Sequence, residues 1–280
     1  MLFIVLDTVI WTMSAKIGFI GAGKMAEALI AGLITKGFYS NDDIIACAPS
    51  QSTRDRVASN YGIRVYEKAE QLLPETDLLV LAVKPGNVDA LFTKENLNIG
   101  KGNILISLVA GLTMENLNAY VPDVKKIRVM PNHCCWVKEG AMGFTCDPTI
   151  TEDEKKRVKY ILSAVGMAIE VPEYQMDCVT GLAGSSPAFF YTIIDAMAQA
   201  GVLNGMPRDM AVKLVAQSML GSAKMVLDTG KHPGQLRDEV CSPAGTTIVG
   251  VKMMEDLGVR SAVINAVDAT INKSAEMSRD

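Results

Sequence analysis

The chain has 280 residues, of which 49% are hydrophobic and 21% charged, and its formal net charge is −4. This composition supports a buried core and excludes an intrinsically disordered chain. The pI near 5.4 gives no electrostatic support for nucleic-acid binding. The length alone is compatible with one or two domains.

The first segment, residues 1–14, is apolar but includes Asp7 and lacks the basic region of a signal peptide. It is also too short to span a bilayer. We interpret it as an N-terminal extension ahead of an alternative start at Met13. A weak anchor or a partner-binding segment is the alternative, and we expect no membrane association.

Residues 15–171 alternate short β-branched runs with helical runs. Strands are expected at 16–21, 43–48, 77–83, 103–109 and 126–130, and helices at 25–37, 53–62 and 113–121. This alternation predicts a parallel sheet with helices on both faces. We therefore expect an α/β architecture with an N-terminal, Rossmann-type dinucleotide-binding domain.

A glycine turn with the sequence GAGKMA follows the first expected strand and opens the first expected helix. Gly21 permits the tight turn, Gly23 lets the backbone approach a pyrophosphate, and Ala26 allows the helix to pack closely on the strand. The helix start adds N–H groups and a favourable dipole. A turn that merely needs glycine is the alternative. We assign Gly21, Gly23, Lys24 and Met25 to cofactor binding.

The end of the second expected strand bears on the identity of the coenzyme. NAD sites commonly place Asp or Glu there, on the ribose 2′-hydroxyl. This strand ends in Cys-Ala-Pro-Ser, and Asp42 and Asp43 lie at its other end. Ser50, Ser52 and Arg54 are suited to a 2′-phosphate. We therefore expect NADP, with NAD as the alternative, and assign Ser50 to the cofactor site.

A second polar turn, LAVKPG, closes the strand expected at residues 77–83. Ligands in such sheets bind beyond the carboxyl ends of the strands. We therefore expect Ala82, Val83, Lys84 and Pro85 to border the cofactor. The alternative is a solvated strand-to-helix turn.

From residue 172 the strand pattern stops, and 186–206 and 207–230 read as long helices that are apolar on more than one face. Helices that are apolar nearly all round must be enclosed, which one small helical domain cannot achieve. We expect residues 172–280 to form an all-α dimerisation and substrate domain in a homodimer. Packing of these helices on the first domain is the alternative.

Cysteine and histidine usage bears on metals and compartment. The six cysteines are scattered without a Cys-x-x-Cys pair, and the chain has only two histidines. Adjacent Cys134 and Cys135 do not have the spacing of a disulfide framework. We therefore expect no metal site, reduced thiols and a cytoplasmic protein.

The chain resembles the pyrroline-5-carboxylate reductase family in motifs that follow one another in the family's order. These are GFIGAGKMAEALI, LAVKPG, RVMPN, EGAMGF, GLAGSSPAFFY, HPGQLRDEVCSPAGTTI and INAV, between residues 16 and 275. The resemblance implies NAD(P)H-dependent reduction of the C=N bond of 1-pyrroline-5-carboxylate to L-proline, the last step of proline biosynthesis. It also implies a homodimer, which in this family often assembles into a pentamer of dimers.

Residues 242–247 match the chemical need of that reaction. A protonated ring imine is already electrophilic, so holding the ring beside the nicotinamide matters more than a strong acid. Small residues and free N–H groups at a helix start can bind the substrate carboxylate. Ordinary N-capping by Ser242, with Pro243 as the first helical residue, is the alternative. The resemblance makes Thr247 the catalytic hydroxyl and Ser242, Ala244, Gly245, Thr246 and Thr247 the substrate-binding residues.

Three segments depart from the family pattern. Asn132-His133-Cys134 stands where relatives usually have Asn-Thr-Pro, and Ala69 stands where many have Asn. Gly230 replaces an acidic residue that some relatives carry. We therefore assign no catalytic carboxylate.

Three other functions compete with the one that the resemblance implies. A β-hydroxyacid dehydrogenase would need a Lys early in its second domain, and no Lys occurs between residues 172 and 212. Reduction of a different cyclic imine is a close variant. A non-catalytic dinucleotide-binding module would bind the cofactor without turnover.

Overall fold

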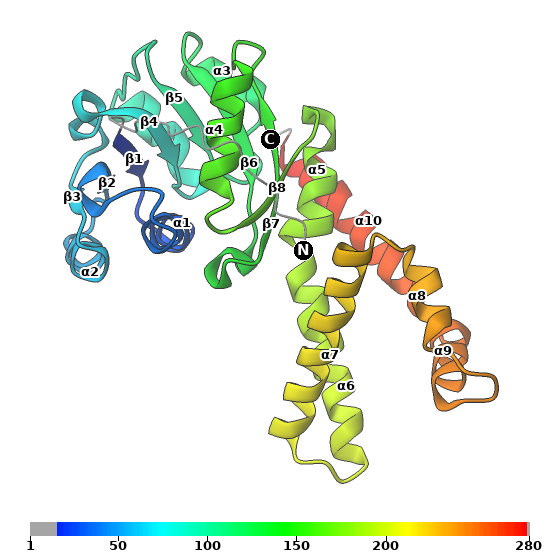
Figure 1. Ribbon diagram of the computed structural model, residues 1–280. Coiled ribbons are helices and arrows are strands. Elements are labelled where there is room, and N and C mark those ends of the chain that lie inside the picture. The colour runs from blue at the N-terminus through cyan, green and yellow to red at the C-terminus, as the bar shows by residue number, and fades with distance from the viewer. Residues whose placement is uncertain (1–15, 279–280) are drawn as a thin grey trace. The chain divides into compact units, whose positions relative to one another are not determined.

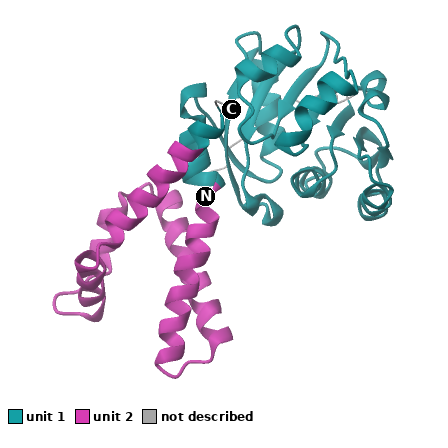
Figure 2. Cartoon of the chain, turned by 180° about the vertical axis from the view of Figure 1, so that it is seen from behind, with its two compact units in different colours: residues 1–184, 274–280 teal, residues 185–273 magenta. Residues whose placement is uncertain are grey.

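A computed structural model describes residues 16–278 (Figure 1). The predicted N-terminal extension, residues 1–14, lies outside this range. The chain divides into two compact units, one formed by residues 1–184 and 274–280 and the other by residues 185–273 (Figure 2).

The first unit is built on an eight-stranded sheet in the order β3-β2-β1-β4-β5-β6-β7-β8. Its strands are β1 (Lys16–Ile20), β2 (Ile44–Cys47), β3 (Arg64–Tyr66), β4 (Thr76–Leu81), β5 (Ile104–Ser107), β6 (Lys125–Met130), β7 (Gly140–Cys146) and β8 (Gly166–Glu170). The first six follow the order of doubly wound dinucleotide folds. The predicted α/β, Rossmann-type architecture is confirmed.

The helices of the two units are α1 (Lys24–Thr35), α2 (Gln51–Tyr61), α3 (Met114–Tyr120), α4 (Glu152–Leu162), α5 (Met176–Val179), α6 (Ser186–Leu203), α7 (Arg208–Thr229), α8 (Pro233–Glu239), α9 (Thr246–Asp256) and α10 (Val259–Met277). In the first unit, α1 to α4 lie between strands in the chain and α5 follows β8. The second unit consists of consecutive helices. The last turn of α10 belongs to the first unit, since residues 274–280 group with the sheet.

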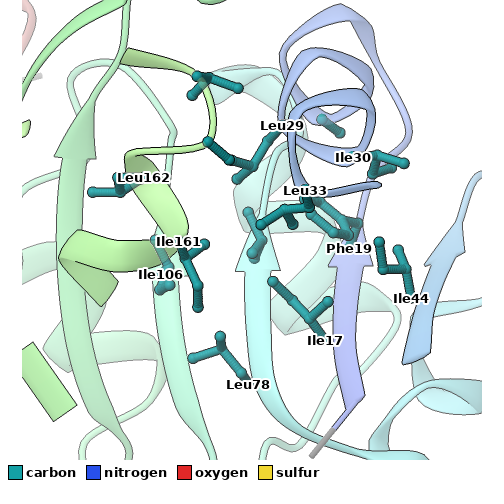
Figure 3. Close-up of a cluster of buried hydrophobic side chains, with 14 of the residues drawn as sticks. Ile17, Phe19, Leu29, Ile30, Leu33, Ile44, Leu78, Ile106, Ile161 and Leu162 are labelled. Carbon is teal, nitrogen blue, oxygen red and sulfur yellow. The ribbon is translucent and has the colours of Figure 1, made fainter. Parts of the chain in front are cut away.

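Both faces of the sheet are apolar because both are covered. Ile17 and Phe19 of β1 point to one face, where α1 and α4 pack with Leu33 and Ile161 (Figure 3). Ile20, next along β1, points to the opposite face and joins a second cluster with α3. Burial on both faces fixes the strand register, because a slip by one residue would exchange the two sets of side chains.

Two parts of the sheet differ from the sequence prediction. The strands β3, β7 and β8 were not among those predicted, and β6 and β7 pair antiparallel, whereas all pairs were expected to be parallel. β3 has only three residues, and β7 contains glycine at positions 140 and 143, which strand propensities disfavour. Gly143 is needed because a Cβ there would lie 2.4 Å from Cγ2 of Val179 in α5.

The boundary between the compact units follows from this packing. Asn132, after β6, donates from Nδ2 to the carbonyl of Ala183 (3.1 Å), so the segment after α5 is tied to the sheet. The units therefore divide after Gly184, whereas the sequence pattern changes at residue 172.

The second unit is helical and leaves much apolar surface uncovered. α6 and α7 form a hairpin of two long helices (Figure 1), and α7 ends at Gly230, whose φ of 64° is typical of a helix C-cap. On α7 the exposed large apolar side chains are Met210, Leu214, Leu220, Met225 and Leu227. Among the described residues, α7 is the one helix that is long and apolar enough to cross a bilayer, by length and composition only.

Candidate active site

The glycine turn between β1 and α1 is fixed at the centre of the sheet. Gly21 has a φ of 95°, in the left-handed region that favours glycine. A Cβ at this position would lie 2.8 Å from the carbonyl oxygen of Ala82 and 3.0 Å from Cγ1 of Val83. The N–H of Gly21 donates to the carbonyl of Cys47 (3.1 Å). The turn therefore lies where the strand order reverses, the point at which such sheets bind nucleotides.

α1 starts directly after this turn without a side-chain cap. Gly23 is its N-cap, and a Cβ built on Gly23 would meet no described atom within 4 Å. Gly23 and Lys24 are exposed, Met25 is half-buried, and Ala26 is fully buried in the core. The first amides of a helix have no intrahelical partner, so this start can receive an anionic group such as a pyrophosphate.

A cleft of about 310 Å³ lies beside the glycine turn. Gly21, Cys47 and Val83 line it from the ends of three neighbouring strands, together with Pro49 and Glu67. A second hollow, of about 460 Å³, shares Pro49 and Glu67 with it. Two predicted cofactor residues, Gly21 and Val83, thus border one cleft at the carboxyl edge of the sheet, where nucleotide ligands bind.

The other predicted residues of the LAVKPG turn lie at the same edge. The N–H of Ala82 donates to the carbonyl of Ile20 (2.8 Å), which joins the ends of β4 and β1. Ala82 is half-buried, whereas Lys84 and Pro85 are exposed. The turn therefore presents Lys84 and Pro85 beyond the strand ends, and their contact with a cofactor stays a prediction.

The loop after β2 is braced by an arginine. Nη1 of Arg54 donates to the carbonyls of Ala48 (2.9 Å) and Pro49 (2.8 Å). Ser50 is the N-cap residue of α2, and its Oγ lies 2.8 Å from Oγ of Ser52. The first turn of α2 has no acidic side chain. The loop thus combines two hydroxyls with a guanidinium, a chemistry suited to a phosphate.

Glu67 was missed in the sequence. β3 pairs with β2 so that Tyr66 lies opposite Cys47, and the N–H of Ala48 donates to the carbonyl of Tyr66 (3.0 Å). Glu67 follows at the same edge, lines the cleft, and places its carboxylate 4.0 Å from Nη2 of Arg54. Recognising β3 as a strand would have revealed this carboxylate.

Cys47 contributes an apolar, un-ionised thiol to the cleft. Burial raises the pKa of the Cys47 thiol to about 11, although the backbone N–H of Gly21 counteracts part of that shift. The thiol is therefore protonated at neutral pH and acts as a small apolar side chain.

The unusual Asn132-His133-Cys134 segment still forms an ordered turn. Oδ1 of Asn132 accepts the N–H groups of Cys134 (3.2 Å) and Ala141 (3.3 Å). A 3-10 helix, His133–Val137, follows. The asparagine thus fixes the turn by itself, and His133 is exposed at its start.

The predicted substrate-binding residues lie on a turn and on the first residues of α9. The helix begins at Thr246 with Gly245 as its N-cap and no side-chain cap. Capping by Ser242, with Pro243 as the first helical residue, is therefore wrong. Ala244 has a φ of 57°, which is incompatible with a helix there.

The amides at this helix start are not equivalent. The N–H of Gly245 donates to the carbonyl of Ser242 (3.0 Å), so the turn itself uses one of the predicted donors. Ser242, Ala244, Thr246 and Thr247 are exposed, and Gly245 is half-buried. The Thr247 hydroxyl and the amides of Ala244 and Thr246 thus remain the predicted contacts for the substrate.

Polar residues just before this turn have structural partners. His232 caps α8, since its Nδ1 accepts the N–H of Gly234 (3.1 Å). Lys231 lies 2.8 Å from Glu239 and holds the pKa of that carboxyl below its ordinary value. Asp238 pairs with Arg237 (2.7 Å). These contacts do not form an acid–base couple.

The predicted cofactor residues all lie in the first compact unit, and the predicted substrate residues all lie in the second. Within residues 16–278 no group of three His, Cys, Asp or Glu side chains is arranged to hold a metal ion. The six cysteines are free thiols.

Comparison with protein families gives two matches along the chain. Residues 16–111 match a family described as NADP oxidoreductase, coenzyme F420-dependent. Residues 173–277 match one described as pyrroline-5-carboxylate reductase dimerisation. The matched regions contain the glycine turn and the α9 start, respectively.

Individual proteins resemble the chain over nearly its whole length. A pyrroline-5-carboxylate reductase of Methanosarcina acetivorans is 42% identical over 94% of this chain and 98% of its own. The structure of a pyrroline-5-carboxylate reductase from Coxiella burnetii superimposes with a TM-score of 0.87 at 33% identity, covering 94% of this chain and 98% of that chain. The Plasmodium falciparum pyrroline carboxylate reductase with NADP bound gives 0.83 at 31% identity, covering 95% and 98%.

Proposed function

Because the chain belongs to the pyrroline-5-carboxylate reductase family, we propose that it transfers a hydride from a reduced nicotinamide dinucleotide to the C=N bond of 1-pyrroline-5-carboxylate, giving L-proline. One observation carries this proposal. A single chain joins a dinucleotide-type glycine turn, open at Gly23, to the family's dimerisation region with its uncapped α9 start. The product would enter proline biosynthesis.

The glycine turn fits a dinucleotide pyrophosphate. Gly21 cannot carry a side chain without meeting the Ala82 backbone, while Gly23 leaves open space before the helix start. In this proposal Gly21, Gly23, Lys24 and Met25 contact the pyrophosphate, and the LAVKPG turn borders the nicotinamide half. The bound cofactor supplies the hydride, and these residues fix its position.

The α9 start fits a small anionic ring. The N–H groups of Ala244 and Thr246 can donate hydrogen bonds to the substrate carboxylate, and the positive end of the helix dipole favours an anion here. The Thr247 hydroxyl orients the ring nitrogen, which carries the proton of the iminium. Holding the ring in one orientation supplies much of the rate and makes hydride delivery selective for one face. No strong side-chain acid is needed.

The coenzyme in this proposal is NADP(H), with NAD(H) as the alternative. Support comes from the serine hydroxyls and Arg54 after β2, and from the relative that was crystallised with NADP. Residues 15–171 serve as the dinucleotide-binding domain and 172–280 as the dimerisation and substrate domain. We place the enzyme in the cytoplasm, where its free thiols stay reduced.

We propose that the chain forms a homodimer through the helical unit. Five such dimers would make the larger assembly, a pentamer of dimers, that the family resemblance implies. The exposed apolar side chains of α7 give the physical reason, because a soluble monomer would leave them in water. A second copy of this helical region covers them in the proposal, so α7 is a dimer helix and does not enter a membrane.

A spectrophotometric assay tests the activity. With 1-pyrroline-5-carboxylate and NADPH or NADH, the absorbance of the reduced nicotinamide should fall, and L-proline should appear in equal amount. Turnover of a hydroxyacid alone would favour a β-hydroxyacid dehydrogenase. Turnover of another ring imine alone would show that the substrate is a different cyclic imine. Cofactor binding without any turnover would indicate a non-catalytic module.

A further inference from the structure

The end of β2 lacks the carboxylate that NAD sites place on the ribose 2′-hydroxyl. The sheet supplies one from the neighbouring strand. Cys47 at the end of β2 is level with Tyr66 at the end of β3, so the next residue, Glu67, is level with Ala48. Glu67 therefore lines the cleft from one strand further out than Cys47.

The lining of the cleft is acidic at this end, and the cationic side chain of Arg54 lies close to one of its carboxylates. Glu67 and Glu95 are the charged side chains among the lining residues, and both are acidic. The side chain of Arg54 is largely buried, and its Nη2 lies 4.0 Å from a carboxylate oxygen of Glu67, which lines the cleft. Arg54 is held in place by the carbonyls of Ala48 and Pro49, and its Nη2 also donates to Oε1 of Gln51 (2.6 Å), whereas the side chain of Glu67 is 65% exposed.

These two groups have opposite preferences for the 2′ substituent of the ribose. A carboxylate accepts a hydrogen bond from a 2′-hydroxyl and repels a 2′-phosphate. A guanidinium binds a phosphate through charge-assisted hydrogen bonds. When Arg54 is paired with Glu67, a 2′-phosphate must compete with that carboxylate for the same cation.

We infer that Glu67 and Arg54 form a coenzyme selector, in which Glu67 favours NADH and Arg54 favours NADPH. This inference rests on the proposed nicotinamide-dependent function and adds to it the residues that set the coenzyme preference. Glu67 lowers the affinity for NADPH in two ways, by repelling the 2′-phosphate and by occupying Arg54.

The test is the dissociation constant of NADPH and of NADH, measured by fluorescence titration for the parent chain and for Glu67→Gln. The ratio of the NADH constant to the NADPH constant should rise by about threefold to tenfold, which is the size expected for an exposed charge at a binding site. Glu70→Gln is the matched control, since Glu70 lines the second hollow but not the cleft. It should leave the ratio unchanged.

A second comparison uses Arg54→Met. This variant should bind NADPH more weakly while changing NADH less, and Glu67→Gln should have a smaller effect in its background. The selector is refuted by an unchanged ratio in Glu67→Gln, by an equal change in Glu70→Gln, or by full additivity of the two substitutions.

The binding measurements do not need turnover, so they separate this inference from the proposed reaction. A shifted ratio in a protein that does not reduce 1-pyrroline-5-carboxylate would support the selector and refute the reaction. Turnover with an unshifted ratio would do the reverse.

Discussion

The carbonyl oxygen of Ala82 lies 2.8 Å from the point that a Cβ on Gly21 would occupy. The end of β4 thus closes on the glycine turn from one side. Two residues further along, a Cβ on Gly23 would meet no described atom within 4 Å. The two glycines therefore have different physical roles, one within the fold and one toward a ligand.

This difference predicts effects of different size for two alanine substitutions. Gly21→Ala should lower the free energy of unfolding by about 1–3 kcal/mol, because the residue must keep a left-handed φ against the Ala82 backbone. Gly23→Ala should cost less than about 1 kcal/mol, because its φ is −81° and its Cβ has room. Urea unfolding followed by circular dichroism measures both.

The substitution of Gly23 should also weaken coenzyme binding. Gly23→Ala should raise the dissociation constant of NADPH by about tenfold or more, since the Cβ keeps the pyrophosphate from amides whose bonds to a charged group are strong. Tight NADPH binding by a well-folded Gly23→Ala protein would contradict the position proposed for the pyrophosphate.

The sequence predicted the order strand, glycine turn and helix, because glycine spacing and apolar runs are local patterns. It also gave Gly21 and Gly23 different roles, but it could not name the atoms around Gly21, since these come from the end of β4, which is distant in the chain. Glu67 was missed for a similar reason. Its position follows from the pairing of β3 with β2, and β3 is too short and too polar to stand out.

The α9 start shows the limit of capping rules. Ser followed by Pro is typical of a helix start, so Ser242 and Pro243 were reasonable candidates. The left-handed φ of Ala244 and the hydrogen bond from the N–H of Gly245 to the carbonyl of Ser242 delay the helix to Thr246. A backbone conformation that alanine rarely adopts leaves no signal in the sequence.

Thr247→Ala tests the proposed contact with the reacting ring. Loss of one hydrogen bond should lower kcat/KM by about 1–2 kcal/mol, or about fivefold to thirtyfold. Thr247→Ser keeps the hydroxyl and should retain most of the activity. Steady-state kinetics with varied 1-pyrroline-5-carboxylate provide the measurement.

Thr270→Ala is the matched control for this substitution. Thr270 is a half-buried threonine on α10, and its Oγ1 donates to the carbonyl of Ala266 within the helix. Its replacement should leave kcat/KM unchanged. If the Thr247→Ala enzyme were as active as the parent, the Thr247 hydroxyl would not be part of the site.

Leu220 and Leu227 of α7 test the proposed dimer. They are seven residues apart on one helix face, with 57% and 70% exposure. Each buried leucine contributes about 1.5–3 kcal/mol, so the double substitution to Gln should raise the dimer dissociation constant by at least tenfold or so. Light scattering over a dilution series would show the mass approaching that of a monomer.

Ser222→Gln on the same helix is the control, because Ser222 is exposed and lies on the side of α7 away from Leu220 and Leu227. It should leave the mass unchanged. A dimer that persists with both leucines replaced would mean that α7 does not supply the main contacts.

Glu75 predicts an acid-dependent loss of stability at the edge of the sheet. Its carboxylate accepts hydrogen bonds from Arg64 (2.7 Å), Tyr66 (2.6 Å) and Lys16 (3.1 Å), which join β1 and β3. These bonds, with Arg64 contributing most, lower the pKa of Glu75 from 4.5 to about 2. A carboxyl whose pKa is lower in the folded state stabilises the protein above its unfolded pKa.

The contribution of Glu75 is therefore complete above pH 4.5 and lost as the pH falls toward 2. Glu75→Gln should be less stable than the parent at pH 6, and the gap should narrow between pH 4.5 and pH 2.5 in urea unfolding. Arg64→Met, which removes the main partner, should raise the folded-state pKa of Glu75, so that the loss is smaller and is complete at a higher pH. A gap that stays constant with pH would show that the three bonds do not act through the ionised carboxylate.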